Sequence, residues 1–210
     1  RDLSTPGNGI LTVANVEKKQ RRRNPAAPFT TSTLQQEASR KLGFSAQKTM
    51  MVAQRLYEGI DVGEGSVGLI TYMRTDSVTV ANEALDELRD LIKDRYGEEN
   101  LPDEPRRYTT KAKNAQEAHE AVRPTSGRRI PEDVKPHLKN DQFRLYELVW
   151  KRTVASQMSP ALFDTVGLDL VSGRAADGNI RFRATGSVLV KPGFMTVYQE
   201  GQDDSTQTDQ

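Results

Sequence analysis

The decisive stretch of this 210-residue chain reads Gly68-Leu69-Ile70-Thr71-Tyr72-Met73-Arg74-Thr75-Asp76-Ser77. Within it, Tyr72 stands two residues before Arg74 and four before Asp76. A phenol oxygen beside a guanidinium is a candidate nucleophile for a phosphodiester, because Arg stays charged and pairs with phosphate through two parallel hydrogen bonds. Free Tyr has a pKa of about 10, so something cationic must favour the phenolate or the phosphorane that follows. On spacing alone, the simpler interpretation is that the Tyr72 ring packs on a core.

Two further segments accompany this stretch. They are Pro28-Phe29-Thr30-Thr31-Ser32-Thr33-Leu34-Gln35-Gln36 and Gln116-Glu117-Ala118-His119-Glu120-Ala121-Val122-Arg123-Pro124-Thr125. In their order along the chain, the three segments resemble the bacterial DNA topoisomerase I family of type IA topoisomerases, and residues 68–77 resemble its active-site signature. The resemblance covers at least residues 10–190, but only the middle of the family's full-length enzyme. Since the first residue is Arg1 rather than Met, we expect a fragment or a processed chain.

The resemblance implies a role for three side chains. Tyr72 would attack one DNA strand and form a 5′-phosphotyrosine link, and the other strand would pass through the gap before resealing. Because the covalent link stores the ester bond energy, relaxation of negatively supercoiled DNA would need no ATP. Arg74 would contact the scissile phosphate, and His119 would hold a neighbouring phosphate. Without the resemblance, His119 is most simply a satisfied histidine in a helix.

Five other side chains are candidates for DNA binding or for supporting the site. They are Thr71, Asp76, Gln54, Glu58 and Arg123. For Thr71 and Asp76, hydrogen bonds that fix the backbone and a direct role are both open. Gln54 and Glu58 lie four residues apart on one helix face, and the resemblance places their counterparts near the active site. An Arg such as Arg123 can reach DNA, but an Arg followed by proline equally marks a helix stop. The hydroxyls of residues 28–36 could contact the DNA backbone or cap a helix.

Composition narrows the classes of function. The net charge is +1, so no overall field points to a polyanionic partner, although a basic run lies at residues 18–23. The chain has no cysteine, which excludes disulfides and a thiolate zinc site. No apolar run reaches the roughly 18 residues of a membrane span, and no signal-peptide pattern is present.

Hydrophobic periodicity predicts the elements. Helices are predicted at residues 32–42, 45–58, 82–96, 114–123 and 141–158, with a short helical turn from 131. Strands are predicted at residues 10–16, 166–170, 180–184, 188–190 and 194–198, with a turn at Asp177-Gly178. The glycines of residues 61–68 formally match G-x-G-x-x-G, but they follow a helix rather than a strand. We therefore reject a dinucleotide site and predict a flexible loop.

This order of elements predicts an α+β fold. A helical domain at residues 25–159 would be inserted into a β domain made of residues 1–24 and 160–200, followed by a disordered acidic tail at 201–210. The resemblance implies the same arrangement. In it, a β-rich arch carries a helix-turn-helix-like domain that bears the catalytic tyrosine and is not used to read sequence.

The resemblance also implies parts outside this chain. The family's metal-binding domain supplies an acidic cluster and a catalytic lysine, whereas this chain has no Asp-x-Asp pair, and Asp203-Asp204 in the tail is no substitute. We therefore expect Mg²⁺ to bind outside the chain, and the chain alone to bind single-stranded DNA weakly without cleaving or relaxing DNA. The implied partners are single-stranded or negatively supercoiled DNA and the metal-binding domain, in the bacterial cytoplasm with the nucleoid and not in a membrane.

Two alternatives stay open. In one, the chain is a non-catalytic single-stranded DNA-binding module in which Tyr72 stacks on a base. In the other, it is an interaction scaffold whose charges are ordinary surface. Substitution of Tyr72 by Phe distinguishes stacking from covalent chemistry, because only stacking tolerates it.

Overall fold

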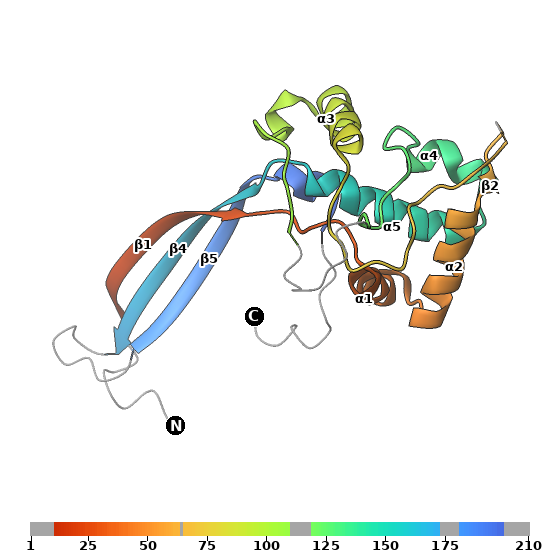
Figure 1. Ribbon diagram of the computed structural model, residues 1–210. Coiled ribbons are helices and arrows are strands. Elements are labelled where there is room, and N and C mark those ends of the chain that lie inside the picture. The colour runs from red at the N-terminus through yellow and green to blue at the C-terminus, as the bar shows by residue number, and fades with distance from the viewer. Residues whose placement is uncertain (1–10, 64, 110–118, 173–180, 200–210) are drawn as a thin grey trace. The chain divides into compact units, whose positions relative to one another are not determined.

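A computed structural model describes residues 11–63, 65–109, 119–172 and 181–199 (Figure 1). The fold class is α+β, with antiparallel sheets and helices, as the sequence predicted. The chain divides into two compact units, one formed by residues 1–24 and 160–192 and the other by residues 25–159 and 193–210. No helix among the described residues is both long and apolar enough to cross a membrane.

The first unit contains a three-stranded antiparallel sheet in the order β1-β4-β5. The strands are β1 (Leu11–Arg23), β4 (Ala161–Ser172) and β5 (Arg181–Lys191). The prediction that the first strand ends at residue 16 is wrong, because β1 continues through the basic run to Arg23 and pairs there with Ala161. The predicted strands at 166–170 and 188–190 are confirmed as parts of β4 and β5.

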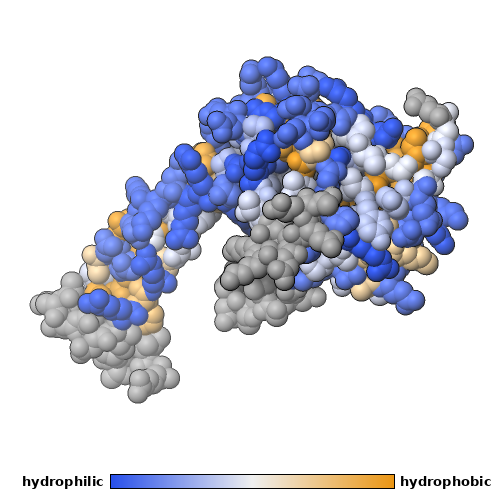
Figure 2. All heavy atoms as spheres, in the orientation of Figure 1, coloured by the Kyte–Doolittle hydropathy of each residue, from blue (hydrophilic) through white to orange (hydrophobic). Residues whose placement is uncertain are grey.

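The two faces of this sheet differ, because successive side chains of a strand point to opposite sides. On one face, the Arg183 guanidinium contacts the Glu17 carboxylate at 2.7 Å and the Asp169 carboxylate at 3.6 Å. Exposed valines lie on the opposite face, among them Val16, Val166 and Val188. Hydrophilic and hydrophobic surface are both visible along the strands in Figure 2.

The second unit is helical. Its α-helices are α1 (Thr31–Leu42), α2 (Ala46–Glu58), α3 (Asn82–Tyr96), α4 (Pro131–Val134) and α5 (Asn140–Ser156). Short 3-10 helices lie at Glu98–Asn100, Lys135–His137 and Gly193–Thr196. Helix α5 packs against α1, α2 and α4, and its apolar side chains form much of the core. The helices predicted at 45–58, 82–96 and 141–158 are confirmed within one or two residues at each end.

The start of α1 follows from its threonines. The N-cap is Thr30, whose hydroxyl accepts a hydrogen bond from the Thr33 amide while the Thr33 hydroxyl accepts one from the Thr30 amide. This capping box places the helix start one residue earlier than predicted. Gly43 ends the helix with φ of 69°, a conformation that glycine adopts without steric cost.

Two predicted elements are wrong. Residues 194–198 do not form a strand: the segment begins as a 3-10 helix, and the Tyr198 hydroxyl donates a 2.6 Å hydrogen bond to buried Glu37 of α1. Of the helix predicted at 114–123, the described residues 119–123 form no helix, and Val122 forms an isolated bridge with Phe29. The predicted turn at Asp177-Gly178 and the predicted tail at 201–210 lie outside the described residues.

The glycine-rich segment forms a small hairpin where the sequence predicted a loop. Strands β2 (Ile60–Asp61) and β3 (Ser66–Val67) pair in antiparallel fashion directly after α2. Gly68 then returns the chain close to α2, since a Cβ at this position would lie 2.6 Å from the Tyr57 carbonyl oxygen. The Leu69 amide donates a 2.7 Å hydrogen bond to the Leu56 carbonyl. The hairpin therefore joins the end of α2 to the segment that carries Tyr72.

Candidate active site

The segment that carries Tyr72 has no regular secondary structure, and its side chains alternate. Met73, Thr75 and Ser77 are buried, whereas Tyr72, Arg74 and Asp76 are exposed. This alternation is typical of an extended backbone with one face on a core. It places the tyrosine, the arginine and the aspartate on the solvent side, as chemistry on a large substrate requires.

Thr71 fixes the backbone in front of the tyrosine. Its amide donates to the Arg123 carbonyl at 2.9 Å, and its hydroxyl donates to the Ala121 carbonyl at 2.6 Å and accepts from the Arg123 amide at 3.0 Å. A further bond runs from the Thr125 amide to the Leu69 carbonyl at 3.0 Å. The segment therefore lies alongside residues 121–125, which belong to another of the three motif segments.

Arg123 is held within the protein. Its guanidinium donates to Glu120 at 2.7 Å and to the Pro124 carbonyl at 2.9 Å. Glu120 also accepts a 2.7 Å hydrogen bond from the Ala81 amide, at the residue that precedes α3. Residues 119–123, the described part of the helix that Arg123 was expected to end, are not helical. The hydrogen bond between Glu120 and the Ala81 amide instead connects this segment to the start of α3.

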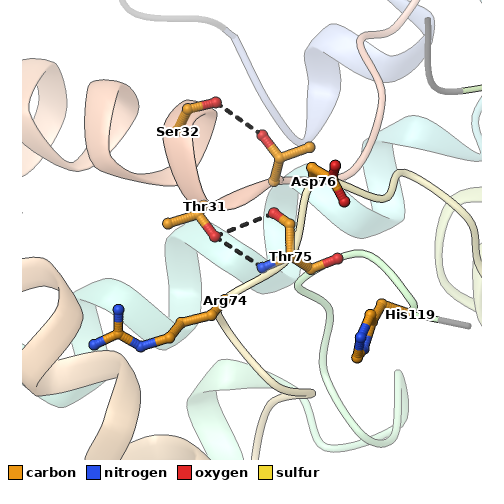
Figure 3. A pocket seen from close by; sticks show the side chains of 7 residues that line it. Thr31, Ser32, Arg74, Thr75, Asp76 and His119 are labelled. Atoms are coloured by element: carbon orange, nitrogen blue, oxygen red, sulfur yellow. Dashed lines mark hydrogen bonds between the residues drawn. The ribbon is translucent and has the colours of Figure 1, made fainter. Parts of the chain in front are cut away.

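An open pocket of about 570 Å³ lies beside the segment, and it brings together residues from all three motifs. Its lining residues are Thr30, Thr31, Ser32, Arg74, Thr75, Asp76 and His119. In Figure 3, the Arg74 and His119 side chains lie on either side of Thr75, and the first turn of α1 supplies the hydroxyls. A guanidinium, an imidazole and several hydroxyls are groups that bind phosphate oxygens. The Arg74, Asp76 and His119 predictions thus converge on one pocket.

Tyr72 lies next to this pocket along the chain but does not line it. Its ring is 42% exposed and contacts the Tyr57 ring edge-on, with centroids 5.3 Å apart and an interplanar angle of 63°. Tyr57 belongs to the last turn of α2 and is itself 41% exposed. Sequence reasoning missed this contact. The feature of the sequence that could have indicated this contact is the position of Tyr57 directly before Glu58, one of the candidate residues.

Gln54 and Glu58 share one face of α2, as their spacing predicted. The Gln54 amide donates a 2.7 Å hydrogen bond to the Glu58 carboxylate. Neither residue lines the pocket that holds Arg74 and His119. The structure therefore places the two residues beside Tyr57, at the end of the helix that contacts the Tyr72 ring.

Burial distinguishes Tyr72 from most of the other tyrosines. Burial raises the pKa of Tyr96, Tyr108, Tyr146 and Tyr198. Among these, the Tyr146 hydroxyl donates to the Arg129 carbonyl at 2.6 Å, and the Tyr108 hydroxyl lies within hydrogen-bonding distance of the Ser156 carbonyl. Burial makes such phenols harder to ionise. The simpler interpretation, that Tyr72 packs on a core, does not fit its exposure.

The described residues do not fit a metal site. Among them, no three His, Cys, Asp or Glu side chains group closely enough to hold a metal ion.

Residues 2–210 match the model of a family described as DNA topoisomerase, and the chain belongs to this family. It is 58% identical to DNA topoisomerase 1 of Xylella fastidiosa over 210 residues, which is all of this chain and 25% of that protein. It is 54% identical to DNA topoisomerase 1 of Rickettsia bellii over 197 residues, 93% of this chain and 24% of that protein.

The structure is similar to that of full-length topoisomerase I from Thermotoga maritima. The TM-score is 0.77 at 40% sequence identity, and the match covers 92% of this chain and 31% of that chain. The family resemblance expected from the three motifs is thereby confirmed. The chain spans about a quarter of the length of the curated relatives that it matches.

Proposed function

We propose that this chain is the part of a bacterial type IA DNA topoisomerase that carries the nucleophile, and that the whole enzyme relaxes negatively supercoiled DNA without ATP. The observation that supports this most is the exposed Tyr72 on a backbone segment that presents Arg74 to a pocket shared with His119. The membership of the chain in the DNA topoisomerase family gives this geometry its chemical context.

In the proposed reaction, the Tyr72 phenol oxygen attacks the phosphorus of one backbone phosphate. The phenol gives up its proton as a bond forms between the tyrosine oxygen and the 5′-phosphate. The bond to the 3′-oxygen breaks, and that oxygen takes up a proton as the 3′-hydroxyl. Resealing is the reverse reaction, so the energy of the phosphodiester is kept. Arg74 stabilises the charge that develops on the phosphate, and one such donor lowers the barrier by about 3 kcal/mol. His119 holds a neighbouring phosphate.

The remaining candidates support this chemistry. Thr71 fixes the backbone before the nucleophile, and Asp76 faces the same pocket as Arg74. Gln54 and Glu58 act from the end of α2, where DNA would pass the tyrosine pair. Arg123 acts indirectly. Its ion pair with Glu120 holds residues 120–124 in place, and this segment makes the hydrogen bonds to Thr71.

We place the Mg²⁺ of the intact enzyme in a separate metal-binding domain, outside this chain. The partners are then that domain and single-stranded or negatively supercoiled DNA, in the cytoplasm with the nucleoid. Residues 1–210 alone would bind single-stranded DNA weakly and would neither cleave nor relax DNA. Mg²⁺-dependent relaxation by the purified 210-residue chain would contradict this proposal.

A chimera tests the function directly. In it, residues 1–210 replace the matched quarter of the 58%-identical Xylella fastidiosa enzyme. We expect the chimera to relax negatively supercoiled plasmid with Mg²⁺ and without ATP, and Tyr72→Phe to abolish relaxation. Tyr96→Phe, which removes a half-buried phenol in α3, is the matched control and should relax the plasmid normally. A Tyr72→Phe chimera that still relaxes DNA would refute the nucleophile assignment.

The tyrosine pair also favours a second candidate function. Exposed Tyr57 and Tyr72 rings form an aromatic surface on which bases could stack, as in a non-catalytic single-stranded DNA-binding module. For such a module, Tyr72→Phe would retain salt-dependent binding and the chimera would form no covalent adduct.

A further inference from the structure

Thr31 is the first residue of α1, and its hydroxyl is not used for capping. The cap is supplied by Thr30, which exchanges two hydrogen bonds with Thr33. The Thr31 hydroxyl instead points away from its own helix, toward the segment that carries Arg74 (Figure 3). The motif threonines therefore divide into one that starts the helix and one that contacts the candidate active site.

The Thr31 hydroxyl contacts the backbone on both sides of Arg74. It lies 2.8 Å from the Met73 carbonyl and 3.1 Å from the Thr75 carbonyl as a donor, and it accepts a 2.9 Å hydrogen bond from the Thr75 amide. Because a hydroxyl carries one hydrogen, the two carbonyls share it. The Thr31 amide adds a 2.9 Å hydrogen bond to the Thr75 carbonyl.

These bonds act together with the burial of both neighbours of Arg74. Met73 is fully buried and Thr75 is largely buried, so their side chains prevent the backbone from rotating freely. Arg74 itself is exposed, and its own backbone is held from both sides by one threonine. The direction in which the Arg74 side chain points into solvent therefore depends on the bonds that Thr31 of α1 makes to this backbone.

We propose that Thr31 is a positioning residue that orients Arg74 toward the scissile phosphate, acting through the backbone of residues 73–75. This inference rests on the proposed function, in which Arg74 contacts that phosphate. It differs from both sequence-based interpretations of the threonine-rich segment, since the hydroxyl would act through the protein backbone rather than by capping its helix or contacting DNA.

Two substitutions separate the hydroxyl from the shape of the side chain. Thr31→Val keeps the β-branched shape and the Thr30 cap but removes the hydroxyl, whereas Thr31→Ser keeps the hydroxyl. In single-turnover cleavage of an oligonucleotide by the chimera, Thr31→Val should lower the rate by about tenfold to a hundredfold with little change in DNA affinity. Thr31→Ser should cleave within about twofold of the unsubstituted chimera. Thr49→Val removes a buried hydroxyl that donates to the Ser45 carbonyl, far from Arg74 in the sequence, and serves as the matched control.

A double substitution tests whether Thr31 acts through Arg74. If it does, adding Thr31→Val to an Arg74→Ala chimera should cost almost nothing further, because the orientation of an absent side chain cannot matter. Hydrogen exchange supplies a readout besides activity: the Thr75 amide should exchange faster in Thr31→Val than in Thr31→Ser.

The outcomes are distinct. A Thr31→Val chimera that cleaves at the unsubstituted rate overturns the inference, and so does an equal loss in the Arg74→Ala background, which would indicate a purely structural role. A chimera with native Thr31 that forms no adduct at Tyr72 contradicts the proposed function, and this inference falls with it.

Discussion

Helix α3 and the segment just before it show two ways in which this chain fixes a structure. In α3, five apolar residues at helical spacing are buried and the backbone bonds are local. In residues 68–77, the backbone has no regular structure and is held by partners far along the chain. The Thr71 hydroxyl bonds to a residue 50 positions away, and the Thr31 hydroxyl bonds to residues 42 and 44 positions away.

The buried side chains of α3 contribute to stability, whereas the exposed side chains of residues 68–77 are the candidates for chemistry. A helix such as α3 can lose an exposed side chain with little effect, because its position depends on its buried stripe. The segment presents its reactive side chains to solvent, so their positions depend on the bonds of its backbone. Substitutions in α3 should therefore change stability, and substitutions at the exposed positions of the segment should change activity.

The largest effect on stability is expected for Leu88→Ala in α3. Leu88 is buried and packs against Gly127, and its truncation should lower the free energy of unfolding by about 2–5 kcal/mol. Urea denaturation of the 210-residue chain can be followed by its single tryptophan, since Trp150 donates a hydrogen bond to the Gly127 carbonyl. Asp86→Ala, on the exposed face of α3, is the control and should change stability by less than about 0.5 kcal/mol. Equal losses in the two variants would break the contrast.

The next effect concerns Arg74→Lys. Lys keeps the charge but not the planar fork, and we expect the cleavage rate of the chimera to fall by about a hundredfold while its unfolding free energy is unchanged. Arg128→Lys, which alters an exposed arginine paired with Asp94, should cleave normally. A large loss of stability in Arg74→Lys would show that the segment and α3 do not differ as described.

A smaller effect is expected from Tyr57, whose ring contacts Tyr72, the proposed nucleophile. Tyr57→Ala removes an edge-on aromatic contact, which contributes about 0.5–1.5 kcal/mol, so cleavage should slow by about twofold to tenfold. Tyr57→Phe retains the ring and should cleave almost normally. If the Tyr57→Phe chimera cleaved as slowly as the Tyr57→Ala chimera, the effect would depend on the Tyr57 hydroxyl rather than on its ring.

A further effect depends on pH. Burial raises the pKa of Tyr146 above its usual value of 10, so the folded chain holds this proton more tightly than the unfolded chain. The resulting stability is fully present below pH 10 and is lost as the pH rises toward the folded pKa. Unfolding free energy measured against pH should therefore fall from about pH 10 upward. Tyr146→Phe should flatten this decline, and an unchanged slope would contradict the assignment.

Local signals predicted the helical unit well. Caps and periodicity located α2, α3 and α5, because each places its apolar residues on one side. They failed where pairing with a distant element decides the structure. The basic run at residues 18–23 has no apolar alternation, yet pairing with β4 makes it a strand. Residues 194–198 have a β-rich composition, yet the bond from Tyr198 to Glu37 holds them against α1.

The candidate site was predictable only in part for the same reason. The motifs predicted Tyr72, Arg74 and His119 as candidate site residues, and the last two line one pocket. The motifs could not show that Thr31 rather than a neighbouring threonine contacts the backbone around Arg74, or that Tyr57 contacts the nucleophile ring. Both contacts join elements that only tertiary folding brings together.

The assignment of Tyr72 as the nucleophile is tested best by locating the covalent adduct. The chimera is mixed with Mg²⁺ and labelled single-stranded DNA, and is then denatured and digested. The peptide that carries the nucleotide is identified by its mass. We predict that the nucleotide is on Tyr72 and absent from Tyr57, although the two ring centroids are only 5.3 Å apart. An adduct on Tyr57 or on any other residue, or DNA binding with no adduct at all, would contradict the claim.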